Sequence, residues 1–223
     1  MAKGFRFFDV ERFPNLSIGQ AYRVPSQLSL VLDMEVPDTS IELVDPNYYS
    51  SFARYRIHHE ILERIHGRAK NVTFEEYVRP VDFPAYYHSE KGVLLMQGKK
   101  EVIIDCARVF SERSADVSIN SRAVDLGKIK PLLTYVKGAW FNLEAAHLRA
   151  AGLFGDRVDQ SEQYKQAEAT GELSAIQVNY EYSGILFVVQ ITMDGAVILY
   201  QNIEPDVELD LLMDVKEKIL DRG

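Results

Sequence analysis

Histidine and glutamate side chains gather in one stretch of the chain, DPNYYSSFARYRIHHEILERIHG, at residues 45–67. If this stretch is helical, His59, Glu63 and His66 fall at positions i, i+4 and i+7, and their side chains converge on one flank. Two imidazoles and a carboxylate suit zinc or iron and leave coordination positions open. The spacing therefore indicates a site for a divalent transition metal. It would support metal-dependent hydrolase or oxygenase chemistry with further ligands from elsewhere in the chain.

The same spacing has a plainer interpretation, in which the flank is a solvated surface of ion-paired side chains. The pattern is not the HExxH zinc motif, because Glu63 stands where that motif has its second histidine. On a helix, His58 would share a face with four apolar residues, which predicts a hydrogen-bonded imidazole in or near the core; these are Ile57, Ile61, Leu62 and Ile65. The metal hypothesis therefore rests on helical geometry alone.

Arginines and an aromatic residue in the same stretch suggest a different chemistry. Guanidinium groups beside aromatic rings can hold phosphates and stack on bases. The segment therefore predicts a surface for nucleic acid or for an acidic partner. The residues expected to form this surface are Arg54, Arg56, Arg64, Arg68 and Tyr55.

A helix over residues 46–66 is what would position both sets of side chains. Asp45 can cap its N-terminus, and Pro46 suits its first helical position. Gly67 supplies the C-terminal stop. Such a helix would be about 30 Å long.

The C-terminal third gives the clearest pattern elsewhere in the chain. Residues 176–182 alternate between apolar and polar, an apolar run follows at 185–191, and Asp194-Gly195 marks a hairpin before 196–201. Three antiparallel strands and a closing helix near 206–221 are expected. Further strands are predicted at 4–10, 28–36, 40–44, 72–78, 92–97 and 115–119, and further helices at 101–110, 131–151 and 159–171.

These elements predict an α+β fold: a predominantly antiparallel sheet with packed helices, and a C-terminal three-stranded meander followed by a helix. The formal charge is −8, of which −1 falls in residues 1–111 and −7 in residues 112–223. We expect an N-terminal half over 1–111 and an acidic half over 112–223, with a boundary near 112–130; the alternative is one domain. The acidic balance disfavours a globally basic nucleic-acid binder.

Two negative observations bear on location. The first residues lack the apolar core of a signal peptide, and no apolar run approaches the roughly 20 residues that span a bilayer. Cys106 is the single cysteine, so no disulfide can form within the chain, and it is expected to be a buried thiol. A cytoplasmic protein without membrane contact is predicted.

No complete catalytic or cofactor motif is present in the sequence. We therefore expect a non-catalytic cytoplasmic binding protein that contacts another protein, or alternatively nucleic acid, through the helix at 46–66. The competing hypothesis is the metal-dependent enzyme that uses His59, Glu63 and His66.

Overall fold

The computed structural model describes residues 2–25, 37–69, 72–143 and 148–223. The chain divides into two compact units. We call Phe8–Asn120 the ribbon unit, and we call Met1–Phe7 together with Ser121–Gly223 the meander unit. Strand β1, Lys3–Arg12, begins in the meander unit and ends in the ribbon unit. The expected halves at 1–111 and 112–223 stay a prediction.

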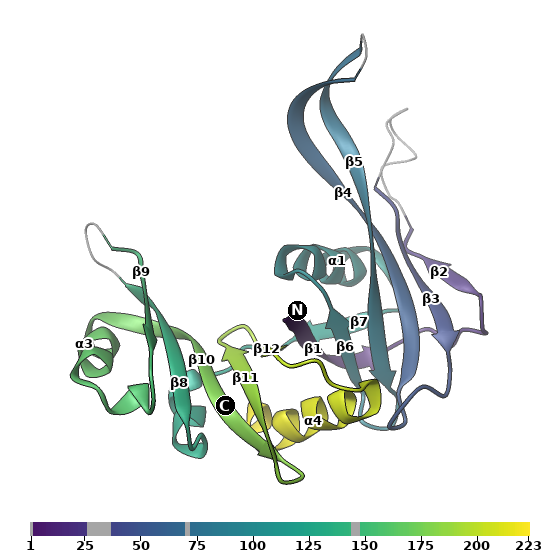
Figure 1. Cartoon of the computed structure of the whole chain (residues 1–223). Helices are drawn as coiled ribbons and strands as arrows, with labels where there is room; N and C mark the ends of the chain where they lie inside the picture. The colour runs from purple at the N-terminus through teal and green to yellow at the C-terminus, as the bar shows by residue number, and fades with distance from the viewer. Residues whose placement is uncertain (1, 26–36, 70–71, 144–147) are drawn as a thin grey trace. The chain divides into compact units, whose positions relative to one another are not determined.

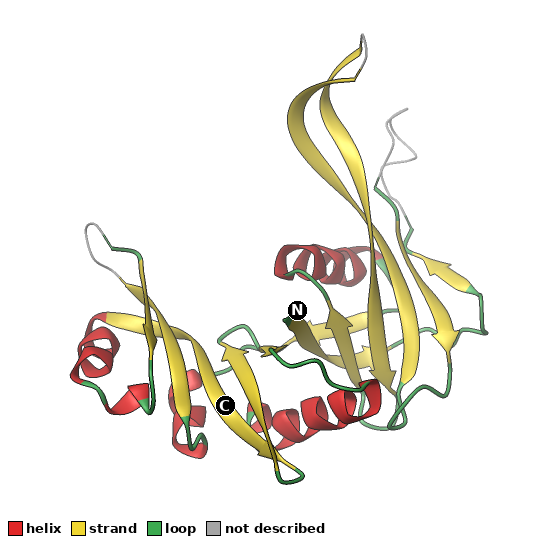
Figure 2. Ribbon diagram, viewed as in Figure 1, coloured by secondary structure: helices red, strands yellow, loops and turns green. Residues whose placement is uncertain are grey.

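Antiparallel sheet dominates the described residues, of which 48% are strand and 25% helix. Figure 2 shows how few helices accompany the strands. The expected α+β class is therefore wrong: the described strands form one hydrogen-bonded series with few helices. The main physical reason is that two segments expected to be long helices, 46–66 and 131–151, are instead mostly strands and turns.

The ribbon unit carries its strands in the order β2-β3-β4-β5-β6-β1, and β7 pairs with the outer part of β1. Helix α1 lies against one face of this sheet (Figure 1). Its apolar side chains, among them Ile103, Cys106 and Phe110, join the core beneath β4 and β6. The elements are β2 Ala21–Arg23, β3 Thr39–Asp45, β4 Ala53–Ala69, β5 Val72–His88, β6 Val93–Gln97, α1 Lys100–Arg113 and β7 Ser118–Ser121.

Strand β4 replaces the expected helix over 46–66. The capping signal of Asp45 and Pro46 is used in a turn, because the Asp45 carboxylate accepts the backbone N–H of Asn47 at 3.0 Å. From Ala53 onward the chain is extended, and Tyr55 and Ile57 face the core. This alternation has the period of a strand, and pairing with β3 and β5 overrides the helical spacing of the histidines.

The meander unit has the strand order β1-β12-β11-β10-β8-β9. Strands β10, β11 and β12 pair antiparallel in succession and helix α4 follows, so the C-terminal part of the prediction is confirmed. The elements are α2 Leu126–Ile129, β8 Val136–Leu143, β9 Ala150–Phe154, α3 Glu162–Thr170, β10 Gly171–Tyr182, β11 Ile185–Thr192, β12 Ala196–Leu199, α4 Pro205–Lys218, and short 3-10 helices at Lys130–Leu132, Val158–Gln160 and Leu220–Arg222.

The helix expected over 131–151 is wrong. Gly138, which would weaken a helix, lies in strand β8. The ring of Phe154 on the neighbouring strand β9 occupies the space that a side chain at position 138 would take. The helix expected at 101–110 is confirmed as α1, and the one at 159–171 is confirmed as α3 with Ser161 as its N-cap. The strand expected at 28–36 lies outside the described residues. None of the helices in the described ranges combines the length and apolar character needed to cross a bilayer.

Candidate functional site: the distal ribbon

The outer halves of β4 and β5 form a two-stranded ribbon. Strand β3 pairs with β4 as far as His59, and β6 pairs with β5 only from Ala85 onward. Beyond these points, apart from the hydrogen bonds between Asp38 and Glu60, the two strands pair only with each other among the described residues. We call residues 60–69 and 72–80 the distal ribbon; in Figure 1 it extends well past β3 and α1.

Apolar side chains are exposed on the distal ribbon. Leu62 is 41% exposed and pairs across the ribbon with the half-buried Val78. Tyr77, on the opposite face by strand alternation, is 36% exposed, and Ile65 is 50% exposed. An isolated two-stranded hairpin is only marginally stable in water, so exposed apolar side chains at these positions mark a surface for contact.

Charged side chains flank these apolar positions, and they are paired within the ribbon. Arg64 on β4 lies 3.0 Å from the carboxylate of Glu76 on β5. Glu63 accepts hydrogen bonds from the Tyr77 hydroxyl, at 2.6 Å, and from Arg79. These two donors lower the pKa of Glu63. The ribbon therefore presents both signs of charge side by side, around an apolar centre.

His59 anchors the base of the ribbon. Its side chain is 1% exposed, and its ring contacts Thr39 on β3 at 2.9 Å and Asp105 on α1 at 3.1 Å. Because an ionised carboxylate can only accept, Nε2 carries the proton and donates to Asp105, and Nδ1 accepts the Thr39 hydroxyl. Burial lowers the pKa of His59 in spite of the neighbouring Asp105 carboxylate. One imidazole thus ties β3, β4 and α1 together.

The hydroxyl, imidazole and carboxylate of this cluster contact one another in the same order as the three groups of a nucleophilic catalytic triad. Here the hydroxyl belongs to Thr39, which is only 2% exposed, so a substrate cannot approach it. Asp105 is held in turn by Arg108, at 2.5 Å. The arrangement is a structural anchor.

The structure does not bring the expected metal ligands together. His59 is buried at the base, Glu63 is bonded to Tyr77 and Arg79, and His66 has an 88% exposed side chain whose nearest acidic partner is Glu75 at 3.9 Å. The helical convergence on which the metal hypothesis depended is absent, because β4 is extended. In the part of the chain that the structure describes, no group of three His, Cys, Asp or Glu residues could hold a metal ion.

The expected partner-binding residues lie along β4. Arg54 stacks 5.4 Å from the ring centre of Tyr48, and Arg56 forms an ion pair with Glu42 at 2.5 Å. Tyr55 points the other way, into the core, and burial raises its pKa. Arg64 and Arg68 are on the distal ribbon, where Arg68 pairs by its backbone with Thr73. Strand alternation thus removes Tyr55 from the surface and leaves Arg54, Arg56 and Arg64 on one face.

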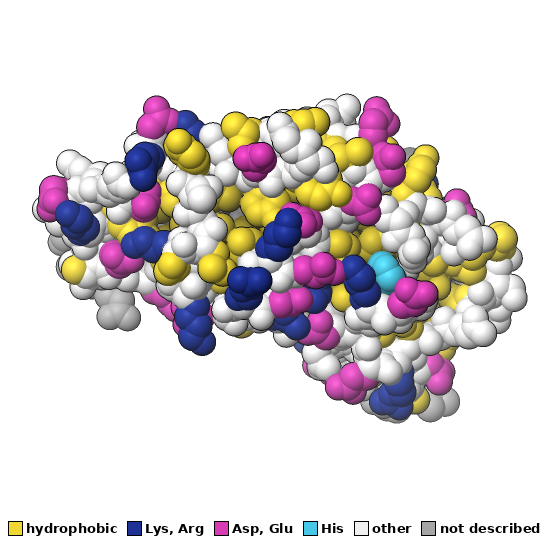
Figure 3. Space-filling view, turned by 90° about the horizontal axis from the view of Figure 1, so that it is seen from below, with side chains coloured by type: hydrophobic (Ala, Val, Ile, Leu, Met, Phe, Trp, Pro, Cys, Tyr) yellow, Lys and Arg dark blue, Asp and Glu magenta, His cyan; other side chains and the backbone are white. Residues whose placement is uncertain are grey.

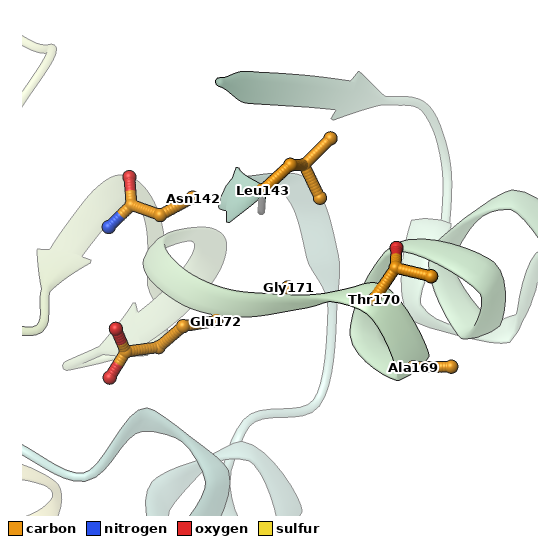
Figure 4. Close-up of a pocket in the computed structure, with 6 residues that line it drawn as sticks. All are labelled: Asn142, Leu143, Ala169, Thr170, Gly171 and Glu172. Atoms are coloured by element: carbon orange, nitrogen blue, oxygen red, sulfur yellow. The ribbon is translucent and has the colours of Figure 1, made fainter. Parts of the chain in front are cut away.

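Open hollows occur in the meander unit. One of about 660 Å³ is lined by Asn142 on β8 and Glu172 on β10, which are cross-strand neighbours. Figure 4 shows these two polar side chains at one end of the hollow, apart from Leu143 and Thr170. Its lining holds no nucleophile with an adjacent base, so it does not indicate a catalytic centre.

Sequence reasoning missed Thr39, Asp105, Leu62 and Val78. The signal for Leu62 was present: Tyr55, Ile57 and Ile61 recur with a period of two, and a strand over these residues places Leu62 on the outer face. No local pattern could reveal that Asp105, 46 residues from His59, would contact it. No protein-family model matches the chain, and no curated protein is similar to it.

Proposed function

We propose that the chain is a non-catalytic cytoplasmic binding protein whose distal ribbon contacts another protein. The observation that supports this proposal is the exposure of Leu62, Ile65 and Tyr77 on a ribbon that extends beyond the rest of its sheet. Protein interfaces have an apolar centre with a polar rim. The distal ribbon has the same arrangement, with Leu62 and Val78 bordered by the Arg64–Glu76 ion pair.

A protein partner fits this surface better than nucleic acid does. Phosphate binding needs cationic groups in excess, whereas Arg56, Arg64 and Arg79 each have a carboxylate beside them. Basic and acidic side chains are also interspersed on the lower face of the molecule, which Figure 3 draws. The ion pairs of Arg56, Arg64 and Arg79 thus neutralise most of the positive charge that the sequence places along β4 and the distal ribbon.

Capture from an extract of the source cells tests the proposal. Leu62→Ser removes the exposed apolar centre of the ribbon, and we expect it to reduce the recovery of a reproducibly captured protein at least tenfold, about 1.4 kcal/mol of binding free energy. Nuclease treatment of the extract should leave this recovery unchanged. The measurement is quantitative mass spectrometry of proteins retained by the immobilised full chain.

Leu132→Ser is the matched control, since Leu132 is 39% exposed and lies in the meander unit. It should retain the captured protein at the level of the unmodified chain. Equal loss in both variants would mean that general surface hydrophobicity, and not the ribbon, retains the protein. Loss of the captured protein after nuclease treatment would favour the alternative in which the chain binds nucleic acid.

A further inference from the structure

We propose that the partner of the distal ribbon is a second copy of this chain, bound face to face about a twofold axis through Leu62 and Val78. This inference rests on the proposed function, since it assigns a partner to the same surface. It follows from the charge pattern of the ribbon, which is complementary to itself. A symmetric dimer requires such a surface, because the same patch lies on both sides of the interface.

The pairing of β4 with β5 fixes which side chains share this face. Arg64 and Glu60 lie two residues to either side of Leu62, so all three point to the same side of the strand. A twofold axis across the ribbon at Leu62 reverses the direction of the strand. It therefore places Leu62 against Leu62 of the second copy, and Arg64 against Glu60 of the second copy. By symmetry this ion pair forms twice.

The side chains concerned are accessible. The Arg64 side chain is 82% exposed and that of Glu60 27%, and Leu62 between them is 41% exposed. Within the chain, Arg64 lies 3.0 Å from Glu76, and the Glu60 carboxylate accepts the backbone N–H of Asp38 at 2.8 Å, so in the dimer each charged group would contact the second copy in addition to these partners. On β5, the axis places Val78 against Val78 and Glu76 against the uncharged Pro80, so no like charges meet directly. Two apolar contacts and two ion pairs are thus compatible with one symmetric arrangement.

The net charge of the ribbon also favours a copy of itself. Charges of opposite sign face each other across protein interfaces, so a surface that binds its own copy must carry both signs. The described distal ribbon carries both signs of charge on each strand, with a formal charge of −1. Its charged residues are Glu60, Glu63, Arg64, Arg68, Glu75, Glu76 and Arg79.

The size of the ribbon sets the strength of the dimer. With the axis at Leu62, the distal ribbons of the two copies overlap over residues 60–64, about 13 Å, and two strands are about 10 Å wide, so the ribbons offer each other roughly 130 Å² per copy. The total is below the range of stable complexes and typical of weak, transient ones. We therefore expect association in the micromolar range or weaker. Sedimentation velocity of the full chain from about 1 µM to about 1 mM covers this range.

Charge-reversal variants test the arrangement. Arg64→Glu alone and Glu60→Arg alone each place like charges together at both symmetric contacts, so each should weaken the dimer at least tenfold. An equimolar mixture of the two variants should restore it, because both contacts are then complementary. Restoration on mixing cannot come from repair of either variant's own fold. The control pair, Lys165→Glu and Glu162→Lys, reverses an exposed ion pair on α3 and should leave the dimer unchanged.

An unmodified chain that sediments as a monomer throughout this range would overturn the inference. So would a dimer that mixing fails to restore, or one that Leu62→Ser leaves intact. Each of these results leaves the proposed function to its own test, because the capture of a different protein through Leu62 does not require a dimer. A monomeric chain that also loses no captured protein on Leu62→Ser would contradict both.

Discussion

Replacing His59 by alanine should lower the free energy of unfolding by about 3 kcal/mol. The substitution leaves a cavity where the imidazole was, and it leaves the buried Thr39 hydroxyl without its acceptor. It also breaks the hydrogen bond to Asp105 on α1. Chemical denaturation followed by circular dichroism measures the change.

His58→Ala is the matched control, since His58 is adjacent in sequence and lies on the opposite face of β4. Its contact with Asp82, at 3.0 Å, is between side chains that are 33% and 61% exposed. We expect a loss of about 0.5 kcal/mol or less. Equal losses in the two variants would contradict the strand alternation that separates a buried His59 from an exposed His58.

Gly195→Ala should destabilise the chain by about 3 kcal/mol or more. Gly195 has a φ of +75° in the turn between β11 and β12, and an added Cβ would lie 2.3 Å from the backbone oxygen of Arg122. Alanine thus combines an unfavourable backbone conformation, worth about 1 kcal/mol, with a clash against a backbone atom that cannot move alone. The measurement is again the denaturation midpoint and its slope.

Gly184→Ala separates the two causes. Gly184 has a nearly identical φ of +76° in the turn between β10 and β11, but nothing lies within 4 Å of an added Cβ. This variant should lose only about 1 kcal/mol. Equal destabilisation by Gly195→Ala and Gly184→Ala would contradict the close contact between the Arg122 backbone and the turn at Gly195.

The meander could be predicted from the sequence because its signals are local. Asp194-Gly195 specifies a tight turn, and residues 185–191 are apolar enough to be a strand buried on both faces. Nearby residues decide the pairing of β11 with β10 and β12, which are short distances away along the chain. Helix α4 follows for a similar reason, since Pro205 and the acidic residues of its first turn suit a helix start.

The ribbon could not be predicted in the same way, because its residues fit two periods. His59, Glu63 and His66 have helical spacing, and Tyr55, Ile57 and Ile61 have strand spacing. Pairing with β5 decides between them. Strand β5 contains Pro80 and Pro84, and prolines favour loops when the sequence is considered alone. In the structure both lie where β5 has no described partner on its second side, so their missing N–H groups cost little.

The candidate site in the structure is therefore an exposed surface, whereas the sequence predicted a set of metal ligands. Helical geometry predicts convergent imidazoles, whereas extended geometry sends neighbouring side chains to opposite faces. Arg64 is the one expected partner-binding residue that takes part in the proposed interface. Its importance there depends on Glu60 and on Leu62, which the helical prediction placed on the apolar face of the helix and not at a binding surface.

Photo-crosslinking from position 62 tests the central claim, contact of the distal ribbon with a protein, most directly. A benzophenone side chain replaces Leu62 in the full chain, in the source cells, and the control carries it at Ile104, which is 43% exposed on α1. We predict a discrete crosslinked product from position 62 and none from position 104. A product of twice the chain mass would identify a second copy. No product from position 62, or the same products from both positions, would contradict the claim.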